Sequence, residues 1–289
     1  MAYAKIIDID DPGYFRLKSI DQSQLKQFLK NPADWAYHRL NDDHKPTDAM
    51  KFGTAFHAYL LGTSDVVSLP EGESFRSKDN QKWRADQLEA GNIIVSYNDM
   101  QLLKRMKEGI EQTSLMPEYP DYMEIIEQGT KEQCIEWKDR QTGLMLKAKP
   151  DLIPAGTDYL VDLKTAQKAD AESFAKEVIN YGYHIQTVFY RAAVAACKPD
   201  AFDRGSKAPS TMQFWVFEKT DACDWQPFSI SDDNPITNLA ATSIRQALLG
   251  IALMVKKAKE EGYAENTPDP VDAAARSEEH TSELQSPVS

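Results

Sequence analysis

Three charged residues in the middle of the chain have the types and the spacing that metal-dependent chemistry requires. Asp151 follows a proline at the end of one apolar stretch. Asp162 and Lys164 lie in the next, "DYLVDLKTA", which is typical of a strand. Alternate residues of a strand point to the same side, so we expect Asp162 and Lys164 on one face and Leu163 on the other.

Two carboxylates that converge from adjacent strands repel each other unless positive charge lies between them. A hard divalent cation with oxygen ligands resolves this repulsion, so the pattern predicts Mg²⁺ or Mn²⁺. Such an ion activates a bound water and neutralises charge on a phosphate under attack, while a nearby lysine orients the water. The alternative is a structural ion-pair cluster, since an acid two residues before a lysine also occurs at Glu136 and Lys138, where we expect Glu136 to be solvated.

The elements around these residues are typical of an α/β domain. A hairpin turning at 140–143 and a strand at 158–166 are followed by two helices, at about 170–180 and 183–198. Strands at 211–220 and 225–231 and a helix from about 235 to 262 complete this part. This order predicts a central mixed sheet flanked by helices.

The N-terminal part reads as helical. "SIDQSQLKQFLKNPADW" predicts two short helices with a break at Asn31-Pro32, and 48–62 a helix that ends at Gly62. Two polar helices between about 78 and 113 are expected at the periphery. We expect one domain over residues 1–275, with a helical part at about 15–115 and a core at about 130–262.

Composition excludes several classes of protein. The chain has 289 residues, 42% of them hydrophobic, and a net charge of −12, which argues against a generally basic nucleic-acid binder but not against a local basic groove. The three cysteines are too widely spaced to indicate a zinc site or a disulfide framework. We found neither a signal peptide nor an apolar run of roughly 18 residues, and therefore expect a cytoplasmic protein without a membrane span.

The last residues, "RSEEHTSELQSPVS" from Arg276 on, differ in character from the rest of the chain. They resemble the in-frame translation of a sequencing-adapter oligonucleotide. We therefore predict that 276–289 is an assembly artefact or a disordered tail, and exclude it from the domain.

Asp151 followed by Asp162-Leu163-Lys164 resembles the signature of the PD-(D/E)xK nucleases, whose fold has a central mixed sheet flanked by helices. The resemblance implies that Asp151 and Asp162 are catalytic residues and metal ligands, together with His57 and the Leu163 carbonyl group. It also implies that Lys164 serves the attacking water. A histidine ligand fits Mn²⁺ somewhat better than Mg²⁺, and both ions remain open.

Two further motifs are similar to those of the RecB-like branch. The stretch from Gly53 to His57 resembles the GxxxH helix, and Gln186 to Tyr190 resembles the QxxxY helix. Gln186 and Tyr190 lie one helical turn apart, so they share a face on which they are expected to contact a DNA phosphate or terminus. The opening and the size of the chain are most similar to the nuclease domain of exonuclease VIII, the RecE type of phages and prophages, over roughly residues 15 to 262.

This resemblance implies a divalent-metal-dependent DNA exonuclease that digests linear double-stranded DNA 5′ to 3′ during phage-type recombination. It implies a homo-oligomeric ring and a RecT-like single-strand annealing partner. A ring reconciles DNA binding with the acidic composition if basic residues line its channel; the candidates are Lys147, Lys149, Lys164 and Lys168.

Two other functions remain open at this stage. One is a single-strand or structure-specific endonuclease of the RecB kind; the related CRISPR-associated enzymes need four cysteines for an iron–sulfur cluster, and this chain has three. The other is a catalytically inactive nuclease-fold module that binds DNA or protein. The intact Asp151, Asp162 and Lys164 argue against the inactive module.

Overall fold

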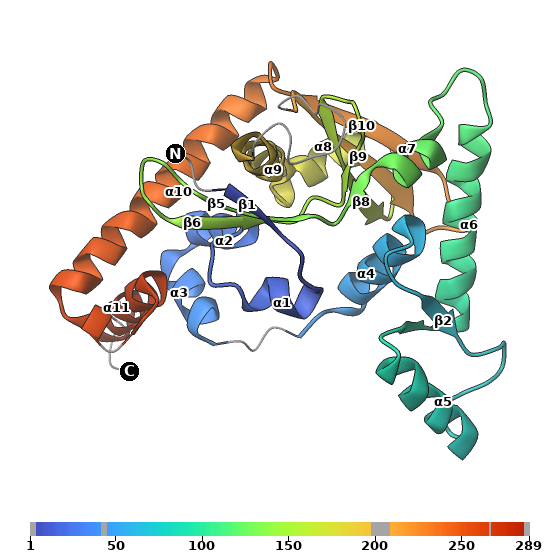
Figure 1. Ribbon diagram of the computed structural model, residues 1–289, viewed down its shortest axis with the longest axis horizontal. Coiled ribbons are helices and arrows are strands. Elements are labelled where there is room, and N and C mark those ends of the chain that lie inside the picture. The colour runs from blue at the N-terminus through green and yellow to red at the C-terminus, as the bar shows by residue number, and fades with distance from the viewer. Residues whose placement is uncertain (1–3, 42–44, 198–208, 266, 286–289) are drawn as a thin grey trace.

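The computed structural model describes residues 4–41, 45–197, 209–265 and 267–285, and Figure 1 shows its elements. The strands are β1 Ala4–Ile7, β2 Val66–Ser68, β3 Ile93–Val95, β4 Thr130–Lys131, β5 Cys134–Lys138, β6 Met145–Ala148, β7 Leu152–Ile153, β8 Tyr159–Ala166, β9 Thr211–Glu218 and β10 Trp225–Ser231. The helices are α1 Asp11–Arg16, α2 Gln22–Lys30, α3 Pro32–Leu40, α4 Asp48–Leu61, α5 Lys78–Glu89, α6 Tyr97–Ser114, α7 Tyr122–Gln128, α8 Ala171–Asn180, α9 Tyr183–Ala196, α10 Pro235–Glu260 and α11 Pro270–Gln285.

The central sheet has the strand order β10-β9-β8-β7-β4. Strand β8 pairs with β9 in parallel along its whole length, through the crossover helices α8 and α9, while β9 and β10 form an antiparallel hairpin. On its other edge β8 pairs antiparallel with the short strand β7, where Leu152 is opposite Val161. The sheet is therefore mixed, and the predicted α/β class with flanking helices is confirmed.

Two hydrophobic clusters cover the two faces of this sheet. Alternation along β8 sends Leu160 and Ala166 into a cluster with α9 and α10, and Val161 and Leu163 into a second cluster with α4, α6 and α7. Figure 1 shows α9 and α10 on one side of β8–β10, and α6 and α7 on the other. Asp162 and Lys164 are the charged residues of this strand, which otherwise has buried apolar residues on both faces.

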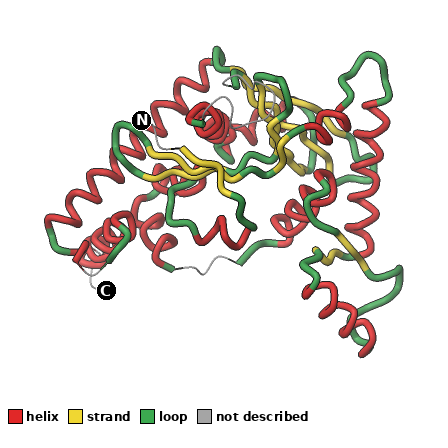
Figure 2. Tube along the Cα trace, viewed as in Figure 1, coloured by secondary structure: helices red, strands yellow, loops and turns green. Residues whose placement is uncertain are grey.

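The predicted hairpin, β5–β6, does not belong to the central sheet. It pairs with β1 in a separate sheet of order β1-β5-β6, as the yellow segments of Figure 2 show. The chain leaves β6 at Ala148 and enters the central sheet at Leu152, so Asp151 lies at the junction between the two sheets. Polar side chains meet at this junction, next to the two hydrophobic clusters.

Helix α10 is long and apolar enough, by length and composition, to span a membrane, which core helices of soluble proteins also are. In the structure Ala240, Ala247 and Ile251 of α10 are fully buried in the cluster that it shares with α9. Polar residues interrupt this stretch, so it contains no continuous apolar run.

Two local expectations were wrong. Helix α6 is not peripheral, since Leu103, Met106 and Ile110 are fully buried in the second cluster. Glu136, which we expected to be solvated, is buried, where it accepts a hydrogen bond from the Ser19 hydroxyl group. Neither burial shows in the sequence, because each depends on a partner from a distant element.

The chain remains helical across the boundary that we placed at Arg276. Helix α11 runs from Pro270 to Gln285, and the Ser277 hydroxyl group donates a hydrogen bond to Glu261. A disordered tail therefore does not describe residues 276–285, while 286–289 lie outside the described residues. The foreign origin of the tail stays a prediction.

Candidate active site

Strand β8 carries the centre of the site, and two helices deliver the other side chains to it. Helix α4 begins at the Thr47 cap and ends at Gly62, and its buried residues Phe52 and Phe56 hold it against β8. Helix α9 begins at Gly182, which has a φ of 66° that favours glycine, and a Cβ there would lie 2.6 Å from the Lys26 side chain. These caps fix the two helices against the strand.

Leu163 links the residues predicted as metal ligands from α4 and the sheet junction. The His57 Nε2 atom lies 2.9 Å from the Leu163 carbonyl oxygen, and the Leu163 N–H donates to Asp151 Oδ2 at 2.7 Å. The remaining ring nitrogen, Nδ1, lies 3.5 Å from Asp151 Oδ1. A carbonyl oxygen can only accept, so Nε2 carries a proton, and Nδ1 faces the carboxylate.

On the opposite face of β8, Asp162 is bound by residues from α9 and β8. Gln186 Nε2 donates to Asp162 Oδ1 at 2.5 Å, and the Lys164 ammonium group forms a close ion pair with Oδ2. The Lys164 Nζ atom also lies 4.8 Å from the centre of the Tyr183 ring. Only 2% of the Asp162 side chain is exposed, so this carboxylate depends on these partners.

The electrostatics of the site separate its two carboxyl groups. Burial raises the pKa of Asp162 to about 6; Lys164 opposes this rise and Asp151 reinforces it. Burial also acts to raise the pKa of Asp151, but His57 and Lys164 outweigh it and hold that pKa below its usual value. For His57, burial acts to lower the pKa, but Asp151 outweighs it and the pKa is raised. A cation near Asp162 would favour its ionised form.

The donor set suits a hard divalent cation, although the side chains are turned toward other partners. Within the residues that the structure describes, no group of three or more His, Cys, Asp or Glu side chains could hold a metal ion. Asp162 points toward Lys164, whereas Asp151 points toward His57. An imidazole, two carboxylates and a backbone carbonyl nevertheless match Mg²⁺ or Mn²⁺ chemistry. Asp162 Oδ2 is fully buried and has the Lys164 ammonium group as its charged partner, so a metal ion there would add to this charge compensation.

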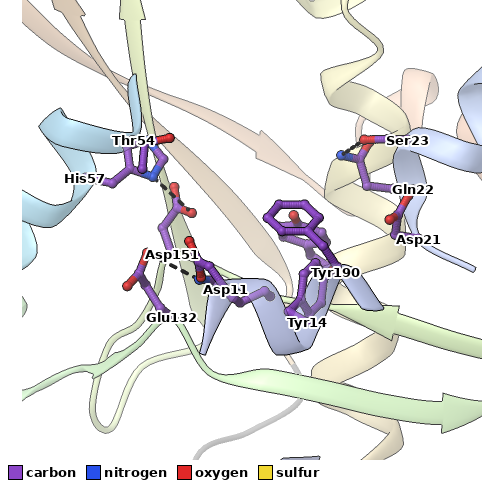
Figure 3. A pocket seen from close by; sticks show the side chains of 12 residues that line it. Asp11, Tyr14, Asp21, Gln22, Ser23, Thr54, His57, Glu132, Asp151 and Tyr190 are labelled. Atoms are coloured by element: carbon purple, nitrogen blue, oxygen red, sulfur yellow. Dashed lines mark hydrogen bonds and ion pairs between the residues drawn. The ribbon is translucent and has the colours of Figure 1, made fainter. Parts of the chain in front are cut away.

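A pocket of about 230 Å³ lies beside His57 and Asp151, and Figure 3 shows it from close by. Tyr190 lines this pocket, whereas Gln186, which we expected to share its role at the DNA, is turned to Asp162. The predicted site residues thus fall into two adjoining groups. His57, Asp151 and Tyr190 line the pocket, whereas Asp162, Lys164 and Gln186 do not; Gln186 and Tyr190 both come from α9, which packs on the Asp162 face of β8.

Two of the lysines predicted to line a DNA channel are engaged elsewhere. Lys147 is 2% exposed, and its ammonium group donates to the backbone carbonyls of Tyr14 and Leu17. Lys149 is paired with two carboxylates at the pocket. Lys147 therefore cannot contact a DNA phosphate, and the lysines left for that role are Lys164, which is partly exposed, and Lys168, which is exposed.

Sequence reasoning missed the pocket wall formed by α1. Asp11, Tyr14 and Phe15 of this helix line the pocket, and Glu132 and Lys149 face them. The signal in the sequence was the Pro at the second helical position after an Asp cap, which marks a helix start. Six residues are too few to show a periodic apolar face, so this helix could not be predicted from its pattern.

Comparison with known proteins identifies the family of this fold. Residues 21–267 match the family model described as "PDDEXK-like domain of unknown function (DUF3799)". This match spans α2 to the end of α10 and includes every site residue predicted from the sequence. No curated protein matches the chain.

Among solved structures, a "Putative exonuclease" from Eubacterium rectale is similar in fold. It is 16% identical, with a TM-score of 0.54 over 87% of each chain. An alkaline exonuclease, LHK-Exo, from Laribacter hongkongensis is 16% identical with a TM-score of 0.28 and covers 72% of this chain and 98% of its own. Its complex with dAMP is 15% identical, with a TM-score of 0.26 over 74% and 96% of the two chains. The similarity to the Eubacterium rectale structure confirms the fold class.

Proposed function

The chain belongs to the PDDEXK-like family, and from this premise we propose that it is a divalent-metal-dependent deoxyribonuclease that hydrolyses phosphodiester bonds of DNA. One observation carries the proposal. His57 and Asp151, which are about a hundred positions apart in the chain, both contact the backbone of Leu163. The Leu163 carbonyl contacts His57, and its N–H donates to Asp151. Leu163 itself lies between Asp162 and Lys164 in the strand. Structural ion pairs alone do not require a backbone carbonyl and an imidazole at the same point.

His57, Asp151, Asp162 and the Leu163 carbonyl would hold the metal, which supplies a Lewis acid for the phosphate and a bound water of lowered pKa. The protein residues then have distinct tasks. The Lys164 ammonium group would donate a hydrogen bond to the attacking water or to a phosphate oxygen.

Two other groups keep these carboxylates in place. Gln186 fixes the orientation of Asp162, and the Leu163 N–H fixes that of Asp151. The burial of Asp162 excludes water that would compete for its oxygens. Tyr190 lies where a phosphate or a DNA end would approach the pocket.

We propose that the substrate is linear double-stranded DNA, digested 5′ to 3′ from an end, as in RecE-type exonucleases of phage recombination. The resemblance of the GxxxH and QxxxY helices supports this assignment. A homo-oligomeric ring, a RecT-like annealing partner, a phage or prophage origin and a cytoplasmic location belong to the same proposal. Lys164 and Lys168 would face the DNA in such a ring, and an oligomer that turns both lysines away from a common groove would contradict it.

Digestion of linear and covalently closed circular duplex DNA separates the proposed exonuclease from an endonuclease. The wild-type protein is incubated with each DNA in Mg²⁺, and label at the 5′ or the 3′ end reports the polarity. We expect linear DNA alone to be consumed, with early loss of the 5′ label. Cleavage of both DNAs would show an endonuclease, and early loss of the 3′ label would contradict the polarity.

A further inference from the structure

Helix α1 presents an exposed aromatic side chain at the pocket that contains His57 and Asp151. Phe15 lines this pocket, and 73% of its surface is exposed. Its ring packs edge-on against Tyr14, with the ring centres 5.5 Å apart. The pocket thus has an aromatic ring at its border that the described residues leave mostly uncovered.

The fold holds α1 at the pocket by the buried Tyr14 side chain and by polar contacts from two lysines. The buried Lys147 ammonium group donates to the Tyr14 carbonyl at 3.0 Å and to the Leu17 carbonyl at 2.9 Å. Lys149 forms an ion pair with Asp11 at the other end of the helix. Two lysine side chains therefore hold both ends of α1 beside the pocket.

The carboxylates around the pocket do not repel an anionic ligand as strongly as their number suggests, because each has a positive or N–H partner. Asp11 and Glu132 both contact Lys149, and Asp151 contacts His57. Asp21, the fourth, caps α2 by accepting from the Gln24 N–H, and it lies 3.9 Å from Lys147 Nζ. A nucleotide with its phosphate at the His57 end is therefore compatible with this pocket.

We propose that Phe15 is a stacking surface for a base of the DNA strand whose phosphate lies at His57 and Asp151, which makes α1 a wall of the substrate site. This inference rests on the proposed nuclease function and specifies how its substrate is held. Exposed aromatic rings beside a phosphate-binding centre bind bases of any sequence, since every base has a π-face. The role of Phe15 is to position the strand, with the chemistry left to the metal-binding residues.

Fluorescence of 2-aminopurine tests this contact, because stacking on an aromatic ring quenches it. Linear duplex DNA carries the probe as its terminal base at the 5′ end or, in a second substrate, at the 3′ end. Binding is titrated in Mg²⁺ in a Lys164→Ala background, in which bound DNA is expected to stay intact. We expect quenching with one of the two substrates, and Phe15→Ala to abolish it and to raise the Kd roughly tenfold. Phe15→Trp should restore both.

The matched control is Tyr119→Ala, which removes an exposed aromatic ring between α6 and α7 that is 48% exposed. It should leave quenching and Kd unchanged. Phe15→Ala is expected to keep the melting temperature, because the ring is mostly in solvent. Equal quenching in Phe15→Ala and in the protein with Phe15 would overturn the inference. A changed oligomer mass of Phe15→Ala in sedimentation, with unchanged quenching, would also overturn it and would make Phe15 part of a protein interface.

A parallel assay keeps this inference separate from the proposed function. The wild-type protein and Phe15→Ala digest linear duplex DNA in Mg²⁺. If the wild type cuts DNA and Phe15→Ala raises KM with little change in kcat, both proposals are supported. If the wild type cuts DNA and the variant has the same KM, only the stacking role fails; if the wild type does not cut DNA, the nuclease proposal itself fails.

Discussion

The Asp162 carboxylate is held by two side chains with different tasks. Lys164 compensates its charge, and Gln186 orients it through a neutral hydrogen bond to Oδ1. A buried carboxylate that loses partners is less well oriented and less readily ionised. Both the orientation and the charge of Asp162 therefore depend on these two contacts. The Gln of the QxxxY helix is then a positioning residue for a metal ligand.

Gln186→Ala should therefore lower kcat on linear duplex DNA by about 10- to 100-fold, the usual effect of losing a group that orients a ligand. KM for the DNA should change little, because Gln186 is buried and turned away from the pocket. Steady-state digestion measures both constants. Gln128→Ala, which removes an exposed glutamine of α7, is the control, and equal kcat values for the two variants would contradict the positioning role.

For single residues, the sequence indicated which side chains are candidates for the site, but not which groups they contact. Asp162 and Lys164 could be placed on one face of a strand from the period of two alone. The contact of His57 with Leu163 could not, since it depends on the packing of α4 across the sheet. Glu136 and Lys147 look like surface charges in the sequence, because burial of a charged residue depends on partners that only the folded chain supplies.

At the scale of elements, the buried Lys147 ties β6 to the segment that contains α1. Lys147→Ala would leave the Tyr14 and Leu17 carbonyls without this donor, at an expected cost of about 2 to 4 kcal/mol in the free energy of unfolding. Urea denaturation measures the change. Lys138→Ala, at an exposed position of β5, should cost well under 1 kcal/mol, and a similar loss for both variants would show that Lys147 anchors nothing.

A second link joins the β5–β6 hairpin to α10. Arg245 Nη1 donates to both oxygens of Asp139, at 3.1 and 3.0 Å, and Thr142 adds further hydrogen bonds. Burial acts to raise the pKa of Asp139, but the hydrogen bonds from Arg245 and Thr142 outweigh it and hold the pKa below its usual value. The ionised form is thus favoured by folding, and the stability that it contributes is present at neutral pH.

Asp139→Asn should accordingly lower the free energy of unfolding at pH 7 by about 1 kcal/mol, since the pair is partly exposed. The difference from the wild type should shrink as the pH falls below the ordinary aspartate pKa and through the lowered pKa of the folded state, because the wild type loses its charge there. Urea denaturation across this range measures it. A difference that is constant with pH would show that ionisation of Asp139 is not linked to folding.

The longer elements could be predicted from the sequence, and the short ones could not. Strands β8, β9 and β10 and helices α9 and α10 are periodic over seven residues or more, so their positions were correct within a few residues. Strands β1, β4 and β7 and helix α1 have two to six residues each. These short elements form the sheet junction and the pocket wall, so the surroundings of the site were the least predictable part.

On the scale of the whole molecule, α11 closes the fold against α3 and α10. Arg39, of whose side chain only 4% is exposed, pairs with Asp269 at 3.1 Å and with Asp272 at 2.9 Å. Val271 and Ala275 add buried apolar contacts to the main cluster. The N-terminal helices and the C-terminal helix thus stabilise each other, although α11 begins beyond the matched family region, which ends at residue 267.

Two truncations test where the domain ends. A chain ending at Pro268 loses both carboxylates of Arg39 and the buried Val271 and Ala275, and should therefore have a melting temperature lower by several degrees. A chain ending at Ala275 keeps both carboxylates and should be close to the full chain. Thermal unfolding followed by circular dichroism compares them, and equal losses would show that residues from Arg276 on belong to the fold.

We propose that the residues around Leu163 hydrolyse DNA with a divalent metal. The most direct measurement is the rate of nucleotide release from linear duplex DNA, in Mg²⁺ or in EDTA, for the wild type, Asp162→Asn and Asp221→Asn, the last a fully exposed aspartate. We predict release only with metal, a loss of at least about a thousandfold for Asp162→Asn, and near wild-type rates for Asp221→Asn. Release in EDTA, or equal rates for the two variants, would contradict the claim.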